Sequence, residues 1–450
     1  METAPAPEEV RTAPWASPDA RARLARVERE LPHDPAEALR RAGEAAQAHV
    51  RRIEEEALLL YAGGNVPEAA GTAAHARMLS GQPSMGYPGD KYQAGLEHLD
   101  LVEVAVARTV ADVMGARFAE VRPTSATLAN LAVYTALAQP GDTIAVLPDW
   151  AGGHLSHHAV GAPGVRGLRV AELPYDAAAL DVDLDRLPGM LARERPVLVV
   201  VGGSLMLRPH RLEAIAEAVH AHGARLLYDA SHVAGLIAEG RFQVPLREGA
   251  DLLTFSTYKS FGGPAGGVVA GDDEELMARV AAAVYPGLTA NYDLARLLPL
   301  GAAAVGHGRS AGRYADACTA TARALEAALA AQGLPVLGQA TGPTRSHHVA
   351  VDVRALGGGP GAARRLAAVD LLLSEIGCPA PDGPDPRGAI RIGTQTVTRQ
   401  GFTEADMPDV ARALADGLQA TRPAEVLRDE VHALRRRHTG TRSLADGDWG

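Results

Sequence analysis

The basic residues of this chain are almost all arginine. Of its 44 lysine and arginine residues, only Lys91 and Lys259 are lysines. A lysine in such a background is a candidate for chemistry that arginine cannot perform, because an amine can lose its proton and attack a carbonyl group whereas a guanidinium group stays charged. Lys259 and Lys91 are therefore the first candidates for a catalytic nucleophile.

An acidic side chain and Lys259 follow two short apolar runs. Asp229 comes directly after residues 226–228, and Lys259 comes shortly after residues 252–255. Ligands of an open α/β sheet bind at the carboxyl ends of the strands, so the two side chains are expected to share one site. The pair fits pyridoxal phosphate, because the amine can form a Schiff base and the carboxylate can keep the pyridine nitrogen protonated. The ring would then act as an electron sink.

The phosphate group of such a cofactor needs an anion site. Residues 123–130 lie where a predicted strand turns into a predicted helix, and they offer hydroxyl and N–H groups. The N-terminus of a helix binds anions through its free N–H groups. We expect Ser125 and Thr127, with Ala126 between them, to hold the phosphate.

The elements that would position these residues alternate along the chain. Between residues 101 and 271, helical stretches alternate with apolar runs at residues 119–122, 143–147, 197–201, 226–228, 252–255 and 267–270. This alternation indicates an α/β fold with a mostly parallel central sheet. We predict an N-terminal arm and helix in residues 1–60, a large cofactor-binding domain in 61–310, a smaller α+β domain in 311–422 and a tail in 423–450.

The predicted elements outside the large domain are fewer. We expect helices over residues 36–60, 311–333, 361–376 and 404–420, strands over 347–353 and 389–392, a loop over 357–361, and a solvated helix end in the tail. His347 and His348 open a strand and are interpreted as solvent or interface residues.

Composition narrows the class of protein. The 450 residues are 47% hydrophobic and 22% charged, with a net charge of -10, which is typical of a folded protein and disfavours nucleic-acid or anionic-membrane partners. Cys318 and Cys378 fit neither a disulfide scaffold nor a zinc site. No signal peptide or membrane span is expected, so we predict a cytoplasmic protein with a small-molecule ligand.

These motifs resemble those of serine hydroxymethyltransferases, which are fold type I (aspartate-aminotransferase-like) pyridoxal phosphate enzymes with a large domain and a smaller C-terminal one. The resemblance covers about residues 50–419 and rests on residues 86–92, 152–157 and 390–394 and on the segments around Asp229 and Lys259. It implies a homodimer with shared active sites. It also implies four site roles: His154 stacks on the cofactor ring, His232 approaches its phenolic oxygen, Ser256 bonds near the Schiff base, and Arg391 binds the substrate carboxylate.

The sequence departs from this family in the part that would contact substrate. The family's catalytic glutamate corresponds to Met85, which cannot transfer a proton or bind the polar ring of folate. Further differences fall at Gly63, Pro83, Gln93 and Tyr258, where the family has serine, tyrosine, tyrosine and histidine. The family's arginine after the lysine is Ala265, and its phosphate-capping loop reads differently at residues 285–292, which weakens the expectation of cross-subunit contacts.

The function that follows is cleavage of a bond at Cα or Cβ of an amino acid or its conjugate by pyridoxal phosphate, without folate, in an aldolase, transaldolase or β-elimination reaction. True hydroxymethyl transfer is one alternative. Natural-product tailoring by decarboxylation coupled to oxidative deamination, as in lincosamide enzymes of this type, is another.

Two chemically different interpretations are weaker. Ser256 and Lys259 satisfy the Ser-x-x-Lys pattern of penicillin-binding enzymes, but the companion motifs Ser-Asp-Asn and Lys-Thr-Gly do not occur. A metal site at His154, His157 and His158 lacks a carboxylate or cysteine ligand nearby, so we predict no metal and interpret His157 and His158 as incidental neighbours of His154.

Overall fold

The computed structural model describes residues 17–32, 34–68, 79–380 and 382–445. The chain divides into two compact units, Met1–Ala57 and Leu58–Gly450. The first unit contains α1 (Pro18–Glu30), α2 (Pro35–Arg51) and a π-helical turn, η1 (Arg52–Glu56). Ser17 and Asp34 cap the two α-helices, because each side chain accepts a hydrogen bond from a first-turn N–H. The helix predicted over residues 36–60 is shorter in the structure. Its α-helical part ends at Arg51, and strand β1 (Leu58–Leu59) follows η1.

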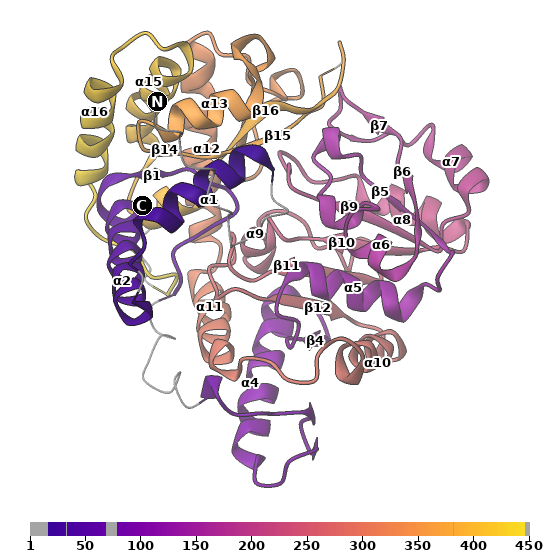
Figure 1. The fold of residues 1–450 in the computed structure, drawn as a ribbon. Helices are drawn as coiled ribbons and strands as arrows, with labels where there is room; N and C mark the ends of the chain where they lie inside the picture. The colour runs from indigo at the N-terminus through magenta and orange to yellow at the C-terminus, as the bar shows by residue number, and fades with distance from the viewer. Residues whose placement is uncertain (1–16, 33, 69–78, 381, 446–450) are drawn as a thin grey trace, which may run out of the picture. The chain divides into compact units, whose positions relative to one another are not determined.

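A seven-stranded sheet forms the centre of the second unit (Figure 1). Its order is β4 (Phe118–Glu120), β12 (Gly267–Gly271), β11 (Leu252–Ser256), β10 (Arg225–Asp229), β9 (Leu198–Gly202), β5 (Thr143–Val146) and β6 (Arg169–Glu172). Only β12 runs antiparallel to its neighbours within this sheet. The predicted α/β class with a mostly parallel sheet is confirmed. Strand β6 was not predicted, because Arg169 and Glu172 interrupt its apolar pattern.

Helices cover both faces of this sheet. Successive residues of a strand enter different cores: Leu253 and Phe255 of β11 belong to one cluster of buried side chains, and Leu252 belongs to the other. The first core also takes side chains from α4 (Glu97–Met114), α7 (Leu187–Glu194), α8 (Leu212–Ala221), α9 (Ala234–Ala238) and α11 (Leu297–Ser310). The second takes them from α5 (Ala126–Leu137), α6 (Ala162–Arg166) and α10 (Glu274–Ala282).

A smaller antiparallel sheet lies in the C-terminal part of the chain. Its order is β13 (His348–Asp352), β16 (Asp385–Gly393) and β15 (Ser374–Cys378), and it packs with α12 (Arg313–Ala331), α13 (Gly358–Ala367), α15 (Met407–Gln419) and α16 (Ala424–Arg436). Figure 1 shows these elements together at the top of the view. Strand β14 (Leu371–Leu372) pairs in parallel with β1.

Three predictions for this region are wrong. The helix predicted over residues 361–376 ends at Ala367, because Asp370 adopts a left-handed φ of 60° and the apolar residues after it form β14 and β15. Residues 357–361 are not a loop beyond Gly357, since α13 begins at Gly358. The tail is not a solvated helix end: α16 buries Leu427, Val431 and Leu434.

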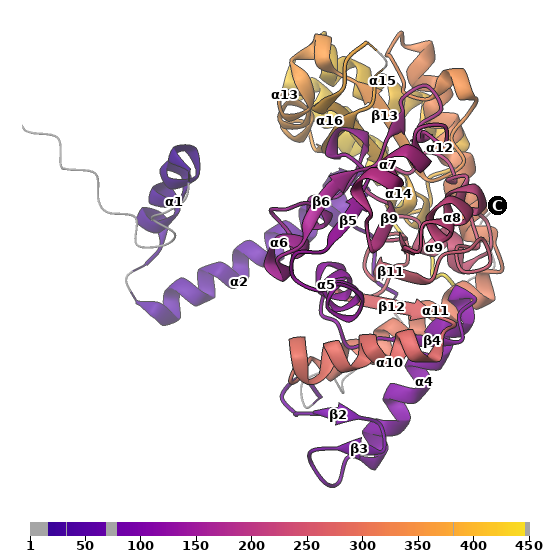
Figure 2. The same cartoon turned by 90° about the vertical axis from the view of Figure 1, so that its right-hand side faces the viewer.

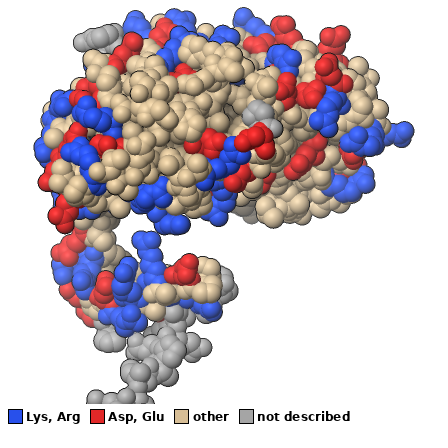
Figure 3. Space-filling view, turned by 90° about the horizontal axis from the view of Figure 1, so that it is seen from above, with Lys and Arg blue, Asp and Glu red and all other residues tan. Residues whose placement is uncertain are grey.

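A hairpin, β2 (Gly86–Tyr87) and β3 (Asp90–Lys91), lies at one end of α4. Figure 2 shows it at the bottom of the view, well away from β9 and β11. On the face seen in Figure 3, basic and acidic side chains are intermingled, and neither sign dominates the described part of that face. No helix among the described residues has both the length and the apolar character needed to cross a membrane.

Candidate active site

A pocket opens at the carboxyl ends of β9, β10 and β11, where the sequence predicted a site. The predicted residues that line it come from four segments: Ser125, Ala126, Thr127, His154, Asp229, His232, Ser256, Tyr258 and Lys259. Asn130, Ser156, Gly203, Ser204 and Ser231 complete the lining. Residues from distant parts of the sequence therefore meet at one edge of the parallel sheet.

Asp229 ends β10 and is held by three donors. One carboxylate oxygen (Oδ2) accepts a hydrogen bond from Nε2 of His157 at 2.7 Å and from the amide of Asn130 at 3.4 Å, and the other (Oδ1) accepts one from the N–H of Ser231 at 2.9 Å. Burial raises the pKa of Asp229, but the hydrogen bonds from His157 and Ser231 and the electrostatic effects of His157 and Lys259 lower it by more, so that it lies well below its usual range. Asp229 is therefore a carboxylate able to keep a facing ring nitrogen protonated.

His157 has a larger role than the sequence suggested. Its side chain is 3% exposed and lies between Asp229 and the hydroxyl of Tyr134, which is 2.5 Å from Nδ1 of His157. The interpretation of His157 as an incidental neighbour is wrong. The spacing of three residues between His154 and His157 places one ring at the pocket and the other behind it, because the turn η4 (Leu155–His157) separates them.

The two lysines lie in different environments. Lys91 forms a buried ion pair with Glu103 in which both side chains are 4% exposed. Lys259 instead lies 3.1 Å from Nε2 of His232, and burial lowers the pKa of its amine to about 8, with a smaller opposing effect from Asp229. A lysine that can become neutral near physiological pH is suited to bond a carbonyl group, so the structure favours Lys259 over Lys91.

Arg391 approaches the pocket from β16 of the smaller sheet. Its guanidinium group donates to the carbonyl of Ser204, lies 3.3 Å from Nε2 of His232 and donates to the hydroxyl of Ser374 at 3.2 Å. Burial lowers the pKa of Arg391 to about 10, and its Nε has no hydrogen-bond partner among the described residues. A buried guanidinium with a free donor needs an anion, which fits the predicted role in binding a substrate carboxylate.

Two adjacent histidines lie near Arg391: His348 is the first residue of β13, and His347 precedes it. His347 and His348 are both fully buried, so their interpretation as solvent or interface residues is wrong. The ring of His348 stands 5.1 Å from that of His232 and accepts a hydrogen bond from the N–H of Met206 at 3.2 Å. Burial lowers the pKa of His347 to about 3 and that of His348 and His232 well below the usual value. The wall beside Lys259 is therefore made of neutral imidazoles.

The residues predicted to bind phosphate form the first turn of α5. The Ser125 hydroxyl caps the helix by accepting a hydrogen bond from the N–H of Leu128 at 3.1 Å. The first N–H groups of a helix have no acceptor within it, so those of Ala126 and Thr127 can bind an anion. Gly267 of β12 permits this turn to come close, because a Cβ atom there would lie 2.2 Å from the carbonyl oxygen of Ser125.

His154 caps η4 and lines the pocket. Its Nδ1 accepts a hydrogen bond from the N–H of Ser156 at 3.1 Å, which orients the ring. Burial lowers the pKa of His154 to about 4, and the positive charge of Lys259 contributes to this shift. A neutral, oriented ring at this position fits the expected stacking role.

The residues that distinguish this chain from the family are not gathered at the pocket. Tyr258 lines it, and Gly63 is buried beside Tyr61, where a Cβ atom would lie 2.5 Å from the tyrosine ring. Met85 and Gln93 instead pair in the β2–β3 hairpin, where the side chain of Gln93 accepts a hydrogen bond from the N–H of Met85 at 3.1 Å. Pro83 is exposed near the same hairpin.

The residues at the pocket fit pyridoxal phosphate. A carboxylate, an amine with a lowered pKa, an open helix N-terminus and a free guanidinium donor are the partners that a pyridine nitrogen, a carbonyl carbon, a phosphate and a substrate carboxylate require. Among the described residues no cluster of histidine, cysteine or carboxylate side chains could hold a metal ion. The donor set therefore supports an organic cofactor.

Most of the chain matches one enzyme family. Residues 42–414 match the serine hydroxymethyltransferase family. The chain belongs to this family. It is 43% identical to an alpha-methylserine aldolase of Variovorax paradoxus over 88% of this chain and 90% of that protein, and 42% identical to a serine hydroxymethyltransferase of Methanopyrus kandleri over 78% and 82%. This membership confirms the prediction of a pyridoxal-phosphate-dependent enzyme that breaks a bond at Cα or Cβ of an amino acid.

A solved structure agrees with the predicted fold. The L-threonine transaldolase of Pseudomonas fluorescens superposes with a TM-score of 0.79 over 90% of this chain and 92% of its own, at 24% identity. The fold type I assignment is confirmed.

Proposed function

We propose that this enzyme cleaves the Cα–Cβ bond of a β-hydroxy-α-amino acid without folate, and that an α-substituted serine is its substrate class. The similarity to alpha-methylserine aldolases of Variovorax paradoxus and Ralstonia sp supports the α-substituent. The observation that carries the proposal is the number of carboxylate side chains in the pocket. Asp229 is the only carboxylate among its described lining residues, and three donors already hold it.

The replacement at residue 85 points the same way. A thioether is a weak acceptor and cannot act as an acid or base, so Met85 cannot perform the task of the glutamate that the family has there. Folate-dependent transfer needs a group that handles the pterin and its protons. Cleavage that releases a free aldehyde needs only a base for the substrate hydroxyl and an electron sink at Cα.

The chain supplies these functions from residues of the pocket. Lys259 bonds the cofactor, Asp229 keeps the ring nitrogen protonated, and residues 125–127 hold the phosphate. The cofactor, when bound, accepts the electron pair of the breaking bond. Arg391 binds the substrate carboxylate and so orients Cβ. His232 is neutral and its Nε2 lies beside Lys259, so it can accept the hydroxyl proton, and Lys259 can return a proton to Cα.

The atoms of the reaction balance without a second substrate. The hydroxyl proton leaves as the Cα–Cβ bond breaks, Cβ departs as an aldehyde, and Cα gains a proton. For α-methylserine the products would be formaldehyde and alanine. No oxidant or reductant is needed.

We infer that two copies of the chain share their active sites. Met85, Gln93 and Pro83 lie on or near the β2–β3 hairpin and do not line the pocket of their own chain. Figure 2 shows this hairpin at the end of α4, away from β9 and β11. A cavity of about 760 Å³ beside this hairpin is lined by apolar side chains, among them Val104, Ala107 and Met277, and by charged ones. Apolar side chains gathered in a cavity of this kind can be covered by a second protein surface. Light scattering coupled to gel filtration should give the mass of a dimer, and the mass of one chain would contradict this inference.

The proposed reaction is tested by substrate profiling of the purified, cofactor-loaded enzyme. Formaldehyde release from α-methylserine and from serine should be measured with and without tetrahydrofolate, and acetaldehyde release from threonine should be measured alongside. We expect turnover of α-methylserine that folate does not change. Serine cleavage that requires folate would restore the hydroxymethyltransferase interpretation, and pyruvate formation from serine would indicate β-elimination instead.

A further inference from the structure

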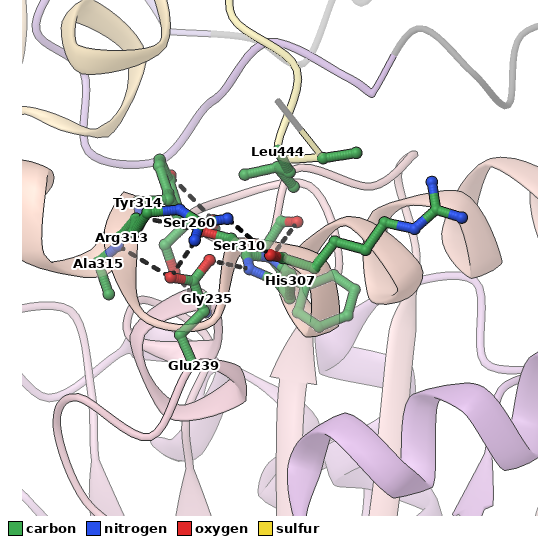
Figure 4. A network of polar contacts seen from close by, with 12 residues as sticks. Gly235, Glu239, Ser260, His307, Ser310, Arg313, Tyr314, Ala315 and Leu444 are labelled. Atoms are coloured by element: carbon green, nitrogen blue, oxygen red, sulfur yellow. Dashed lines mark hydrogen bonds and ion pairs between the residues drawn. The ribbon is translucent and has the colours of Figure 1, made fainter. Parts of the chain in front are cut away.

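The peptide groups that follow Lys259 are held from behind by a buried polar network (Figure 4). The carbonyl oxygen of Ser260 accepts hydrogen bonds from the hydroxyl of Tyr314 at 3.1 Å and from the amide of Asn65 at 3.4 Å. The carbonyl oxygen of Phe261, one residue further, lies 2.9 Å from Nε2 of His307. Two consecutive carbonyl groups of the lysine loop are thus bound by side chains of three distant segments.

His307 belongs to α11 and pairs with Glu239, the residue that follows α9. Nδ1 of His307 lies 2.9 Å from a carboxylate oxygen (Oε1) of Glu239, and both side chains are 0% exposed. The other carboxylate oxygen (Oε2) accepts hydrogen bonds from the hydroxyl of Ser310 and from the N–H of Ala315, each at 3.1 Å. Every polar atom of the Glu239 carboxylate therefore has a partner.

The chemistry of the acceptors decides where the hydrogen atoms lie. A backbone carbonyl only accepts, so Nε2 of His307 must carry the hydrogen that it shares with Phe261. The Ser310 hydroxyl accepts from the N–H of Tyr314 at 3.0 Å and gives its own hydrogen to Glu239. One proton remains between Nδ1 of His307 and Oε1 of Glu239. Whichever atom holds that proton, the carboxylate keeps Nε2–H of His307 directed at Phe261.

The same network reaches the pocket through Ser260. The Ser260 hydroxyl donates to the carbonyl oxygen of His232 at 2.6 Å and accepts from the N–H of Gly235 at 3.1 Å. The ring of His232 is the group that stands 3.1 Å from Nζ of Lys259. Ser260 therefore anchors both the lysine loop and His232, whose ring faces the lysine. The carbonyl oxygen of Ser260 is in turn held by Tyr314 and Asn65.

We propose that His307 is a positioning residue for Lys259 and that Glu239 acts by holding the ring of His307 so that Nε2–H points at Phe261. The lysine is displaced by substrate in each catalytic cycle and must return, so its backbone has to stay in place while the side chain is free. The bond from Nε2–H of His307 to Phe261 provides that constraint. This proposal rests on Lys259 as the cofactor lysine, and its readout below does not require turnover of any substrate.

Two substitutions separate the two contacts of His307. The amide nitrogen of asparagine can take the place of Nδ1, whereas that of glutamine can take the place of Nε2. His307→Asn keeps a donor for Glu239 and loses the bond to Phe261, while His307→Gln keeps the bond to Phe261 and leaves a carboxylate oxygen of Glu239 without its donor. A buried carboxylate without a donor is costly, so His307→Gln should be the less stable variant.

The measurement is the rate at which apoprotein bonds pyridoxal phosphate at Lys259, followed by absorption and by borohydride trapping. We expect this rate to fall about tenfold in His307→Asn, as loss of one well-placed hydrogen bond allows, and to stay within about twofold in His307→Gln. Binding of pyridoxamine phosphate, which cannot bond the lysine, should be unchanged in both. His307→Gln would then be less stable than His307→Asn and yet bond the cofactor faster.

The controls exclude a general effect of stability. His432 pairs with Asp370 at 2.8 Å far along the chain, so His432→Asn and His432→Gln should change the melting temperature and not the loading rate. Tyr314→Phe removes a donor to Ser260 and should resemble His307→Asn, which keeps the test usable if one variant fails to fold. Loading rates that follow melting temperature across all five variants, or equal rates for His307→Asn and His307→Gln, would overturn the proposal.

Discussion

The pocket around Lys259 and the hairpin that carries Met85 differ in how they are built. The pocket is made by strand ends of one sheet and is lined by the residue types that a cofactor requires. The hairpin stands at the end of α4, and Lys91 and Glu103 form a buried ion pair beneath it. A parallel sheet fixes its strand ends within one chain, whereas a place for the hairpin in a catalytic site rests on the proposal that two copies share their sites. The residues that bind the cofactor can thus be identified within one chain, whereas those that contact the substrate cannot.

The largest effect is expected when each lysine is replaced by arginine. Lys259→Arg keeps the positive charge but cannot bond the cofactor, so activity should fall roughly 10³-fold or more. Lys91→Arg keeps the ion pair with Glu103 and should remain within a few-fold of the original enzyme. Comparable losses in both variants, measured as kcat at saturating cofactor, would remove the distinction between the two regions.

A smaller loss is expected at the ring nitrogen. Asp229→Asn should still bind cofactor but cleave substrate about a hundredfold more slowly, because about 3 kcal/mol of charge stabilisation is lost and each ~1.4 kcal/mol is tenfold in rate. Cofactor content by absorption and turnover by aldehyde release are the two measurements. Near-native turnover would show that the carboxylate is not needed.

Loss of the contact between His157 and Asp229 should have a smaller effect than loss of the Asp229 carboxylate. His157→Asn removes the Nε2 donor to Asp229 and should lower kcat about tenfold, since a hydrogen bond to a charged group contributes about 1.5–3 kcal/mol and the remaining donors stay. His158→Asn alters the neighbouring residue and should leave kcat unchanged. Equal effects of the two substitutions would argue against a specific role for His157.

The lowered pKa of Lys259 predicts a pH dependence. The neutral amine bonds the cofactor, so the loading rate of apoprotein should rise as pH approaches 8 and level off above it. At pH 7 roughly a tenth of such amines is neutral, against less than roughly one in a thousand for an ordinary lysine. A loading rate that still climbs at about pH 10 would place Lys259 in an ordinary environment.

The smallest effect is expected where the hairpin is altered. Met85→Glu restores a carboxylate but leaves Gly63, Pro83 and Gln93 unchanged, so it should not create folate-dependent formation of serine from glycine. Calorimetric titration with tetrahydrofolate should show no tight binding before or after the substitution. Folate activity from this one change would mean that the residues that contact the substrate differ from the family at residue 85 alone.

The positions of Asp229 and Lys259 could be predicted from the sequence, because the strand just before each residue determines where it lies. Asp229 and Lys259 follow buried strands, and adjacent parallel strands bring their carboxyl ends together. His157 and His348 could not be placed, because their hydrogen-bond partners Asp229 and Met206 lie far away in sequence and no periodicity marks a buried polar contact. Nothing local marks the burial of His347 either, since its ring nitrogens have no hydrogen-bond partner among the described residues. The second half of the predicted helix over residues 361–376 was wrong for a related reason, since pairing of β14 with β1 overrides a local apolar pattern.

Because Lys91 and Lys259 are the only lysines of the chain, the residue that bonds the cofactor can be identified directly. Borohydride reduction of the cofactor-loaded protein followed by peptide mapping should place the cofactor on the peptide that contains Lys259 and leave the peptide with Lys91 unlabelled. Label on Lys91, or on neither lysine, would contradict the assignment of the pocket at the ends of β10 and β11 as the catalytic site.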